Sequence, residues 1–451
     1  MPELNTSDKK FLNKLPEYES HIEFALKAAK NYGADATEVS IAENAGLSVT
    51  VRQNEIETLE RHQDKGLSLT VFINQCKGSA STTDFSNKAI KEAVKVAVDI
   101  ARFTSNDEFS GLPSESDLAW DYPSLDLFHP WHILADEAVN LACECEAAAL
   151  RKDKRITNSE GVTVSTHNAL KLYGNSHGFV GSYPSSSHSL SCSVIASDND
   201  LMQRDFWYTA SREAAFLQNP KEVGRHAAKR ALARLNGKQI QTGNYPVLFS
   251  AEMSAGLLGH LTAALQGSNV YRESSFLQNA MDTKIFPEWL SIFEQPHIIG
   301  AVGSAPFDSE GVKTSSRHIV SDGILDSFIL DSYSARKLDM HSTGNAGGVH
   351  NLCIETGDLN FNAMLKQLDK GLLVTELMGQ GINIVTGDYS RGAAGFWIEG
   401  GKIQYPVEEI TIAGNLKEMF SKIVAVGNDI DFRRNIRTGS ILIEEMMVAG
   451  N

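Results

Sequence analysis

One histidine, His260, lies in the apolar segment 251–266, whose sequence AEMSAGLLGHLTAALQ predicts a helix. Imidazole is a common zinc ligand, but a protein zinc site needs three or four donors, and a zinc hydrolase also needs a carboxylate that activates water. His260 therefore cannot hold zinc alone. Two interpretations remain open: a core histidine hydrogen-bonded inside the fold, or a residue that lines a cleft.

A second pair of histidines, His341 and His350, flanks a glycine-rich loop at residues 342–349. Together with Glu355 or Asp358 they could form a separate site, and an independent hydrolase built on them is one hypothesis. Loops run over the surface of a protein, so a surface position is the simpler interpretation. The loop lacks the strand-turn-helix context of a phosphate-binding loop.

The serine and cysteine residues indicate no nucleophile. Residues 185–189 read Ser-Ser-Ser-His-Ser, but they lack the Gly-x-Ser-x-Gly elbow and alternate like a strand, which predicts a hydroxyl-rich strand face. Cys143 and Cys145 lie in a helical pattern, where positions two apart point to different faces, so they do not predict a metal clip. Cys353 is close to His350 in sequence only, which is not the geometry of a catalytic triad.

The best binding candidate is the run of polar residues that follows Gly387. The sequence predicts a polar tip there. In one interpretation Asp388 and Arg391 pair across a tight turn, which presents Tyr389 and Ser390; in the other, the tip lines a substrate passage or a subunit contact. No residue is predicted to be catalytic or to bind a metal. The predicted cleft-lining residues are His260, Asp388, Tyr389, Ser390 and Arg391.

The tip belongs to a glycine-dense, β-branched segment, residues 375–416, which predicts a β-rich structural centre because glycine permits turns and close backbone contacts. Gly400-Gly401 predicts a two-residue hairpin between apolar strands. In the first half of the chain, alternation over 36–81 predicts an antiparallel meander with turns at 44–46 and 64–66. The polar stretch 77–84 is a candidate edge strand for pairing with a peptide.

Helices are predicted where apolar residues recur with helical spacing and capping residues stand at the ends. The predicted fold class is α+β, with a helix-plus-antiparallel-sheet domain over residues 1–237 and a β-rich domain over residues 238–451. The predicted helices are 16–31, one that begins after Ser86, 134–150, 219–235, 251–266, and two short ones near 362–370 and 416–423.

The composition of the 451 residues narrows the partners. The formal net charge is −15, and an acidic chain repels a phosphate backbone, so nucleic-acid binding is not expected. No apolar run reaches the length of a membrane span, and the first 20 residues lack a signal-peptide pattern, so we expect a cytoplasmic protein without membrane contact. Five irregularly spaced cysteines fit a reducing compartment.

Several motifs, spread over nearly the whole chain, resemble the TldD/PmbA family, and most closely its PmbA (also called TldE) branch. They are KGSASTTD at 77–84, DLFHP at 126–130, YGNSHG at 173–178, PFDSEGV at 306–312, SARKL at 334–338, MGQG at 378–381, TGDYSRGAAGFWIE at 386–399, QYPVEEITIAGNL at 404–416 and VGND at 426–429.

The resemblance implies a subunit of a metalloprotease that acts on peptides and unfolded proteins. The TldD branch is similar at helix 251–266 but has a His-Glu-x-x-x-His motif that binds zinc, with a cysteine near the C-terminus as a further ligand. Here Ala255 and Gly256 stand in place of the first His and the Glu, and Thr438 stands in place of the Cys. The resemblance therefore implies that this chain carries no cofactor and that zinc belongs to a TldD-type partner. Whether this chain alone is an enzyme stays open.

An alternative is a binding or regulatory homodimer without proteolytic activity, in line with the family's older description as a modulator of DNA gyrase. A stable homodimer that ignores a TldD-type partner would favour this alternative.

Overall fold

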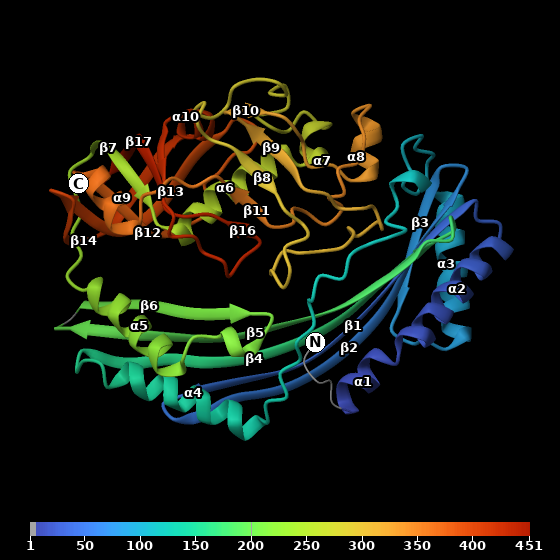
Figure 1. Cartoon of the computed structure of the whole chain (residues 1–451), viewed down its shortest axis with the longest axis horizontal. Helices are drawn as coiled ribbons and strands as arrows, with labels where there is room; N and C mark the ends of the chain where they lie inside the picture. Colours follow the sequence, from blue (N-terminus) through green and yellow to red (C-terminus); the bar gives the residue numbers. More distant parts are fainter. Residues whose placement is uncertain (1–5, 200) are drawn as a thin grey trace.

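The computed structural model describes residues 6–199 and 201–451. The first half of the chain forms one long, curved antiparallel sheet with helices on its convex side (Figure 1). The second half is a β-rich body that lies on the concave side of this sheet. The linker between the two halves follows α5 (Pro220–Ala233) and precedes β7 (Gly243–Phe249), and the boundary predicted after Gly237 lies within it.

The long sheet has the strand order β3-β2-β1-β4-β5-β6. Each neighbouring pair is antiparallel. The strands are β1 (Ala36–Arg52), β2 (Glu55–Ile73), β3 (Cys76–Thr82), β4 (Ile156–Asn175), β5 (Val180–Asp198) and β6 (Leu201–Ser211). β3 and β6 form the two edges, so the edge position predicted for 77–84 is confirmed.

Strands β1 and β2 are longer than the sequence predicts. The turns predicted at 44–46 and 64–66 are wrong, because both strands continue unbroken through them and pair along their length. The reversals lie at 53–54 and 74–75, where non-glycine residues adopt positive φ angles of 49 to 64° as in a two-residue hairpin. Gly46 lies inside β1. Glycine is needed at this position because a Cβ there would lie 2.4 Å from a histidine ring and a backbone carbonyl.

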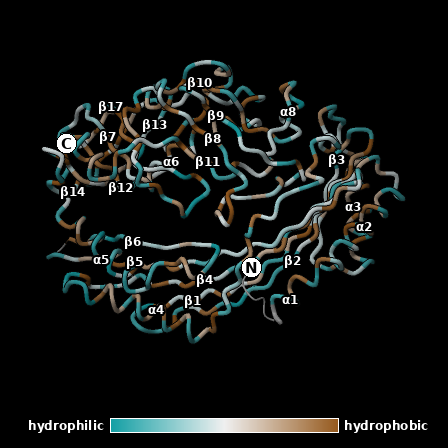
Figure 2. The backbone as a smooth tube through the Cα atoms, in the orientation of Figure 1, coloured by the Kyte–Doolittle hydropathy of each residue, from teal (hydrophilic) through white to brown (hydrophobic). Residues whose placement is uncertain are grey.

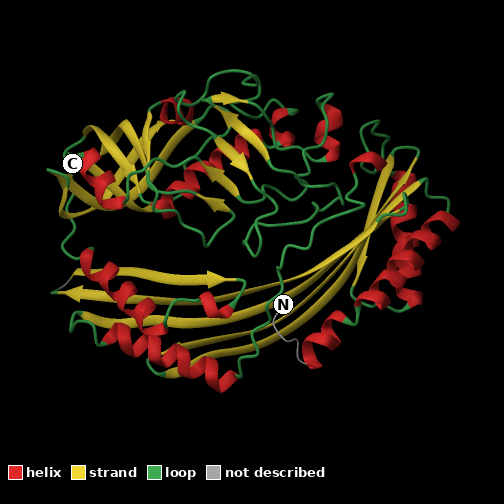
Figure 3. Cartoon of the chain, in the orientation of Figure 1, coloured by secondary structure: helices red, strands yellow, loops and turns green. Residues whose placement is uncertain are grey.

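Helices cover the convex face of the sheet, α2 and α3 towards one end and α4 and α5 towards the other (Figure 3). Ser86 Oγ accepts a hydrogen bond from the N–H of Ala89 at 3.3 Å, and Asn219 Oδ1 accepts one from the N–H of Lys221 at 3.0 Å. Helices α3 and α5 therefore start at the predicted caps. The helices on this side are α1 (Thr6–Leu12), α2 (Leu15–Asn31), α3 (Asn87–Phe103), α4 (Ala135–Leu150) and α5, and the first half also contains the 3-10 turns η1 (Glu115–Asp117) and η2 (Ala214–Phe216).

The two faces of the long sheet differ chemically, because successive side chains of a strand point to opposite sides. On β5, Leu190 and Cys192 are buried in the core beneath α4 and α5. The alternate positions carry half-buried or exposed hydroxyls on the concave side: Ser187, Ser189, Ser191 and Ser193. The predicted hydroxyl-rich strand face is confirmed, and it lines the space between the two halves.

The second half contains two sheets around one apolar core. The larger sheet has the order β14-β13-β12-β7-β17-β15, and the smaller one β10-β9-β8-β11-β16. The strands are β8 (Ile292–Glu294), β9 (Arg317–Ser321), β10 (Ile324–Leu325), β11 (Leu352–Ile354), β12 (Gly371–Met378), β13 (Asp388–Glu399), β14 (Lys402–Asn415), β15 (Ile423–Val426), β16 (Ile436–Arg437) and β17 (Ile441–Ala449). The helices are α6 (Ala251–Leu265), α7 (Gly267–Val270), α8 (Ser332–Lys337), α9 (Phe361–Leu368) and α10 (Leu416–Ser421).

The glycine-dense segment supplies the end of β12 and all of β13 and β14, which form one side of the larger sheet, where apolar stretches gather (Figure 2). Gly400 and Gly401 have φ angles of 60 and 67° and connect β13 to β14, which confirms the predicted hairpin. Gly395 allows a close approach, because a Cβ there would lie 1.8 Å from the carbonyl oxygen of Leu373. The α+β class is confirmed. No described helix is long and apolar enough to cross a membrane.

Candidate functional site

Helix α6 lies against β7, β12 and β16 and has two unlike sides. Its buried side carries Leu257, Leu258 and Leu261. On the other side, a Cβ added to Gly256 would meet no described atom within 4 Å, and one added to Gly259 would only just touch a neighbour. His260 follows Gly256 by four residues and so lies on the same side. We call Gly256, Gly259 and His260 the open side of α6.

His260 packs against strand β13. Its ring lies edge-on to that of Tyr389, with 6.0 Å between the ring centroids. Among the described residues, neither His260 Nε2 nor the buried Nε of Arg391 has a hydrogen-bond partner. Burial, and then the charge of Arg391, lower the pKa of His260 below its ordinary value. The imidazole is therefore neutral at physiological pH.

The predicted polar tip is in fact the start of β13, so its side chains alternate between two faces. Tyr389 is 2% exposed, and burial raises its pKa to about 12. It is therefore not presented to solvent, so the interpretation that predicts an exposed Tyr389 is wrong. Asp388 does not close a turn with Arg391: it accepts hydrogen bonds from Thr386 Oγ1 at 2.6 Å and from the Asn415 amide at 3.3 Å. Tyr389 and Arg391 share the face towards His260, and the exposed Asp388 and Ser390 share the other.

The surroundings of His260 do not fit a zinc ion. A neighbouring guanidinium opposes a divalent cation, and Ala255 and Gly256 supply no donor. Thr438 is fully buried, and its hydroxyl donates to the carbonyl of Gly439 at 2.9 Å. In the ranges that the structure describes, no three His, Cys, Asp or Glu side chains are grouped so that they could hold a metal ion. That zinc belongs to another chain remains a prediction.

The second histidine pair is not assembled into a metal site. His341 is exposed, whereas His350 is half-buried and its backbone N–H donates to Glu294 Oε1 at 2.5 Å. Glu355 and Asp358 are both exposed. The described residues contain no group of acids, cysteines and histidines that joins these side chains around a metal.

Ser186 and His188 hold loops in place. Ser186 Oγ donates to the carbonyl of Arg212 at 2.8 Å. The His188 ring bonds Thr166 Oγ1 at 2.9 Å and the carbonyl of His129 at 2.8 Å. Since both ring nitrogens are occupied, His188 cannot activate a serine here.

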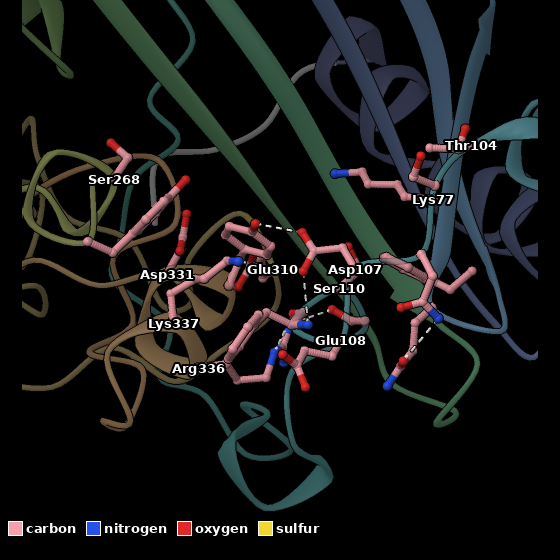
Figure 4. A pocket seen from close by; sticks show the side chains of 18 of the residues that line it. Lys77, Thr104, Asp107, Glu108, Ser110, Ser268, Glu310, Asp331, Arg336 and Lys337 are labelled. Atoms are coloured by element: carbon pink, nitrogen blue, oxygen red, sulfur yellow. Dashed lines mark hydrogen bonds and ion pairs between the residues drawn. The ribbon is translucent and has the colours of Figure 1, made fainter. Parts of the chain in front are cut away.

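At one end of the concave space, α8 closes against the loop that follows α3, beside a cavity of about 1180 Å³ (Figure 4). Arg336 donates to the carbonyls of Phe109, Gly111 and Leu112 at 2.6, 2.9 and 3.0 Å. Tyr333 donates its hydroxyl proton to Asp107 at 2.6 Å. We call these six residues the α8 clamp. Because Asp107 to Leu112 precede the linker, the clamp joins the two halves.

At the other end, the first turn of α6 meets β6 beside a cavity of about 910 Å³, the β6 cavity. Glu252 accepts from Arg230 at 3.0 Å and from Arg433 at 2.9 Å. Arg433 also stacks on Trp207, with 4.4 Å from its guanidinium carbon to the ring centroid. The remaining carboxylate partners of the two arginines are Asp205 and Asp431. We call these six residues the α6 clamp; it too joins the two halves.

Family models match three consecutive parts of the chain: PmbA/TldA metallopeptidase domain 1 at residues 37–101, the central domain at 128–235 and the C-terminal domain at 242–450. Together they span most of the sequence. The chain belongs to the PmbA/TldA metallopeptidase family.

Relatives within the PmbA/TldA family place the chain more finely. It is 50% identical over 432 residues, 96% of each chain, to metalloprotease PmbA of Escherichia coli O157:H7. It is 22% identical over 394 residues to the metalloprotease TldD homologue of Buchnera aphidicola, covering 82% of this chain and 80% of that protein. A crystal structure of a candidate modulator of DNA gyrase from Bacteroides thetaiotaomicron has a TM-score of 0.92 and 30% identity, over 96% of this chain and 99% of that one.

Sequence reasoning missed both clamps of this PmbA/TldA family member. Arg336 lies in the SARKL motif, but its partners are backbone carbonyl oxygens. Every residue has such an oxygen, so no pattern of side chains predicts these partners. Glu252 and Arg433 are 181 residues apart. One available signal was the charge of Glu252 at the start of an otherwise apolar helix, since a carboxylate there needs a partner when it is buried.

Proposed function

We propose that this chain is the subunit without zinc ligands in a two-chain peptidase whose other subunit is a TldD-type protein. The observation that carries the proposal is the open side of α6, where His260 is accompanied by Gly256 and by the guanidinium of Arg391. Identity of 50% to a PmbA and 22% to a TldD homologue supports the same assignment. Zinc and the water-activating carboxylate would come from the partner.

In this proposal the chain contributes walls of the substrate chamber. The hydroxyls of β5 would face the chamber, because they line the concave side that the second half covers. His260 and Arg391 would line a cleft on the open side of α6, with the buried Tyr389 packed against His260, whereas Asp388 and Ser390 point to the opposite face of β13 and are better placed for a subunit contact. The substrates would be peptides and unfolded proteins of the cytoplasm.

The test compares the purified chain with a mixture of the chain and a TldD-type partner. The purified chain should bind less than one zinc ion per molecule and show no peptidase activity, and mixing it with a TldD-type partner should produce a stable complex that cleaves peptides. Stoichiometric zinc together with turnover by the chain alone would contradict the proposal.

The homodimer alternative makes a different prediction in the same experiment. Size-exclusion chromatography with the partner present would then show an unchanged homodimer, and peptide cleavage would not increase. Substitution of His341 and His350 tests the third hypothesis, because an independent hydrolase built on them would lose its activity.

A further inference from the structure

The β6 cavity is lined by Arg437 of β16, a cation that does not belong to the α6 clamp. The cavity lies between β6, the first turn of α6 and the loop after β15. The Nε of Arg437 is buried and, among the described residues, has no hydrogen-bond partner, nor does the guanidinium pair with any described carboxylate. Its guanidinium carbon lies 4.7 Å from the ring centroid of Phe432.

The other charged groups of the cavity are already paired. Arg212 donates to the carbonyls of Ser186, Ala301 and Val302. Asp429 accepts from the N–H and hydroxyl of Ser440 at 2.9 and 2.6 Å. In the α6 clamp, each arginine pairs with Glu252 and with one further carboxylate. Among the described arginines and carboxylates of the cavity, the guanidinium of Arg437 alone has no hydrogen-bond or ion-pair partner, and a ligand that pairs with it carries a negative group.

The rim of the same cavity is apolar. Phe216, Ile299 and Phe432 are 74, 63 and 58% exposed, which is unusual for side chains of this size. A guanidinium binds a carboxylate through two parallel hydrogen bonds, and a neighbouring apolar group would cover the exposed rings.

We propose that the β6 cavity is a subsite for a peptide carboxylate, in which Arg437 pairs with the carboxylate and the rim takes the large apolar side chain beside it. That the ligand is a peptide rests on the proposed function. Ser250 supports the site, because it lines the same cavity and its buried hydroxyl has no hydrogen-bond partner in the described chain. The carboxylate can be the C-terminus of the peptide or the side chain of an Asp or Glu.

The test measures the binding of fluorescently labelled tetrapeptides to the purified chain alone, by anisotropy. A peptide that ends in Phe with a free C-terminus should bind about tenfold to a hundredfold more tightly than its C-terminal amide, the difference expected for a charge-assisted pair. An amidated peptide with Glu beside Phe distinguishes a side-chain carboxylate from a terminal one. Equal binding of all three peptides would overturn the proposal.

The variants locate the effect. Arg437→Gln should bring the ratio of acid to amide affinity close to one, Arg437→Lys should keep part of it, and Arg272→Gln, at an arginine that lines the other cavity, should leave it unchanged. Unfolding curves of each variant show whether it folds. A folded Arg437→Gln variant that keeps the full ratio contradicts the site.

The subsite and the proposed function can fail independently. Selective binding without peptidase activity in the presence of the partner would leave the subsite standing and reject the two-chain peptidase. Cleavage by the complex with the same kcat/KM for acid and amide peptides, in wild type and Arg437→Gln, would reject the subsite alone. If Phe216→Ser converts a dimer into a monomer and leaves peptide affinity unchanged, the rim is a subunit contact and the proposal is wrong.

Discussion

The α8 clamp and the α6 clamp join the same two halves of the chain at opposite ends of the concave space, but with different chemistry. In the α8 clamp, one guanidinium binds three backbone carbonyls. In the α6 clamp, Glu252 lies between two guanidinium groups, each with a further carboxylate and one stacked on Trp207. The charges in the second arrangement depend on one another, whereas those in the first do not.

The difference determines how much stability each clamp loses when Arg336 or Glu252 is removed. A backbone carbonyl that loses Arg336 is left neutral and can be hydrated. A guanidinium that loses Glu252 keeps only its second carboxylate where only 15 to 20% of the side chain is exposed, and the N–H group that faced Glu252 loses its acceptor, which is costly for a charged donor. The α6 clamp should therefore be the more fragile of the two.

The largest expected effect tests this fragility. Glu252→Ala should lower the free energy of unfolding by about 3 kcal/mol, because it leaves Arg230 and Arg433 with one carboxylate each. Urea unfolding checks it. Glu288→Ala, at an exposed residue paired only with Lys284, should cost less than about 0.5 kcal/mol. Equal losses in the two variants would show that burial of the clamp does not matter.

Arg336→Ala should cost less, about 2 kcal/mol, because it removes several hydrogen bonds from a charged donor to backbone carbonyls. Arg336→Lys should fall between Ala and wild type, since an ammonium cannot reach three separate carbonyls as a planar fork does. Urea unfolding of the three proteins gives the order. A lysine variant as stable as wild type would show that the fork geometry is not needed.

Between roughly pH 5 and pH 7, the titration of Asp308 should lower the free energy of unfolding by about 1–2 kcal/mol. Burial, with the charge of Glu310, raises the pKa of Asp308 to about 7. The folded protein therefore holds a proton that the unfolded chain has lost, and stability falls as the pH rises towards 7. Asp308→Asn should flatten this slope in urea unfolding measured at several pH values. An unchanged slope would exclude Asp308 as its source.

The α6 clamp has the opposite sign. Burial alone would raise the pKa of Asp431, but the hydrogen bonds and charge of Arg433 outweigh it and lower the pKa. The contribution of Asp431 is complete above the ordinary carboxyl pKa and is lost as the pH falls through the lowered one. Acidic pH should therefore weaken the α6 clamp, whereas the contribution of Asp308 to stability should increase.

The smallest effect concerns the helix that carries Glu252. Gly256→Ala should raise the free energy of unfolding by about 0.5–1 kcal/mol, because alanine favours a helix and its methyl group meets open space. Gly224→Ala is the matched contrast, since a Cβ there would lie 2.1 Å from the carbonyl oxygen of Cys145 and should destabilise the protein. Thermal unfolding compares them. A loss of stability in Gly256→Ala would mean that the open side of α6 is not open.

Much of the fold could be predicted from local patterns. Helical spacing with a cap at Ser86 or Asn219 places α3 and α5, and Gly400-Gly401 places the hairpin between β13 and β14. The wrong turns at 44–46 have a physical cause. Glycine indicated a turn, but Gly46 serves a close contact inside a strand, and the actual turn uses non-glycine residues at positive φ.

The candidate site was predicted in part. The sequence identified His260 and the residues of β13, but it read a strand as a turn, so it paired Asp388 with Arg391 instead of placing Tyr389 and Arg391 beside His260. Whether these residues line a substrate cleft stays a prediction. Arg437 could not be singled out, because being unpaired is a property of its surroundings in three dimensions.

The carbonyls held by Arg336 have a consequence for sequence change over evolution. Every residue offers the same backbone oxygen, so Arg336 recognises the path of the loop and not the identities of Phe109, Gly111 or Leu112. The loop is free to drift in sequence provided that its course is kept, which constrains Gly111 most, because its φ of 149° suits glycine. One arginine thus lets a connection between the two halves tolerate substitutions that would disable a pair of matched side chains.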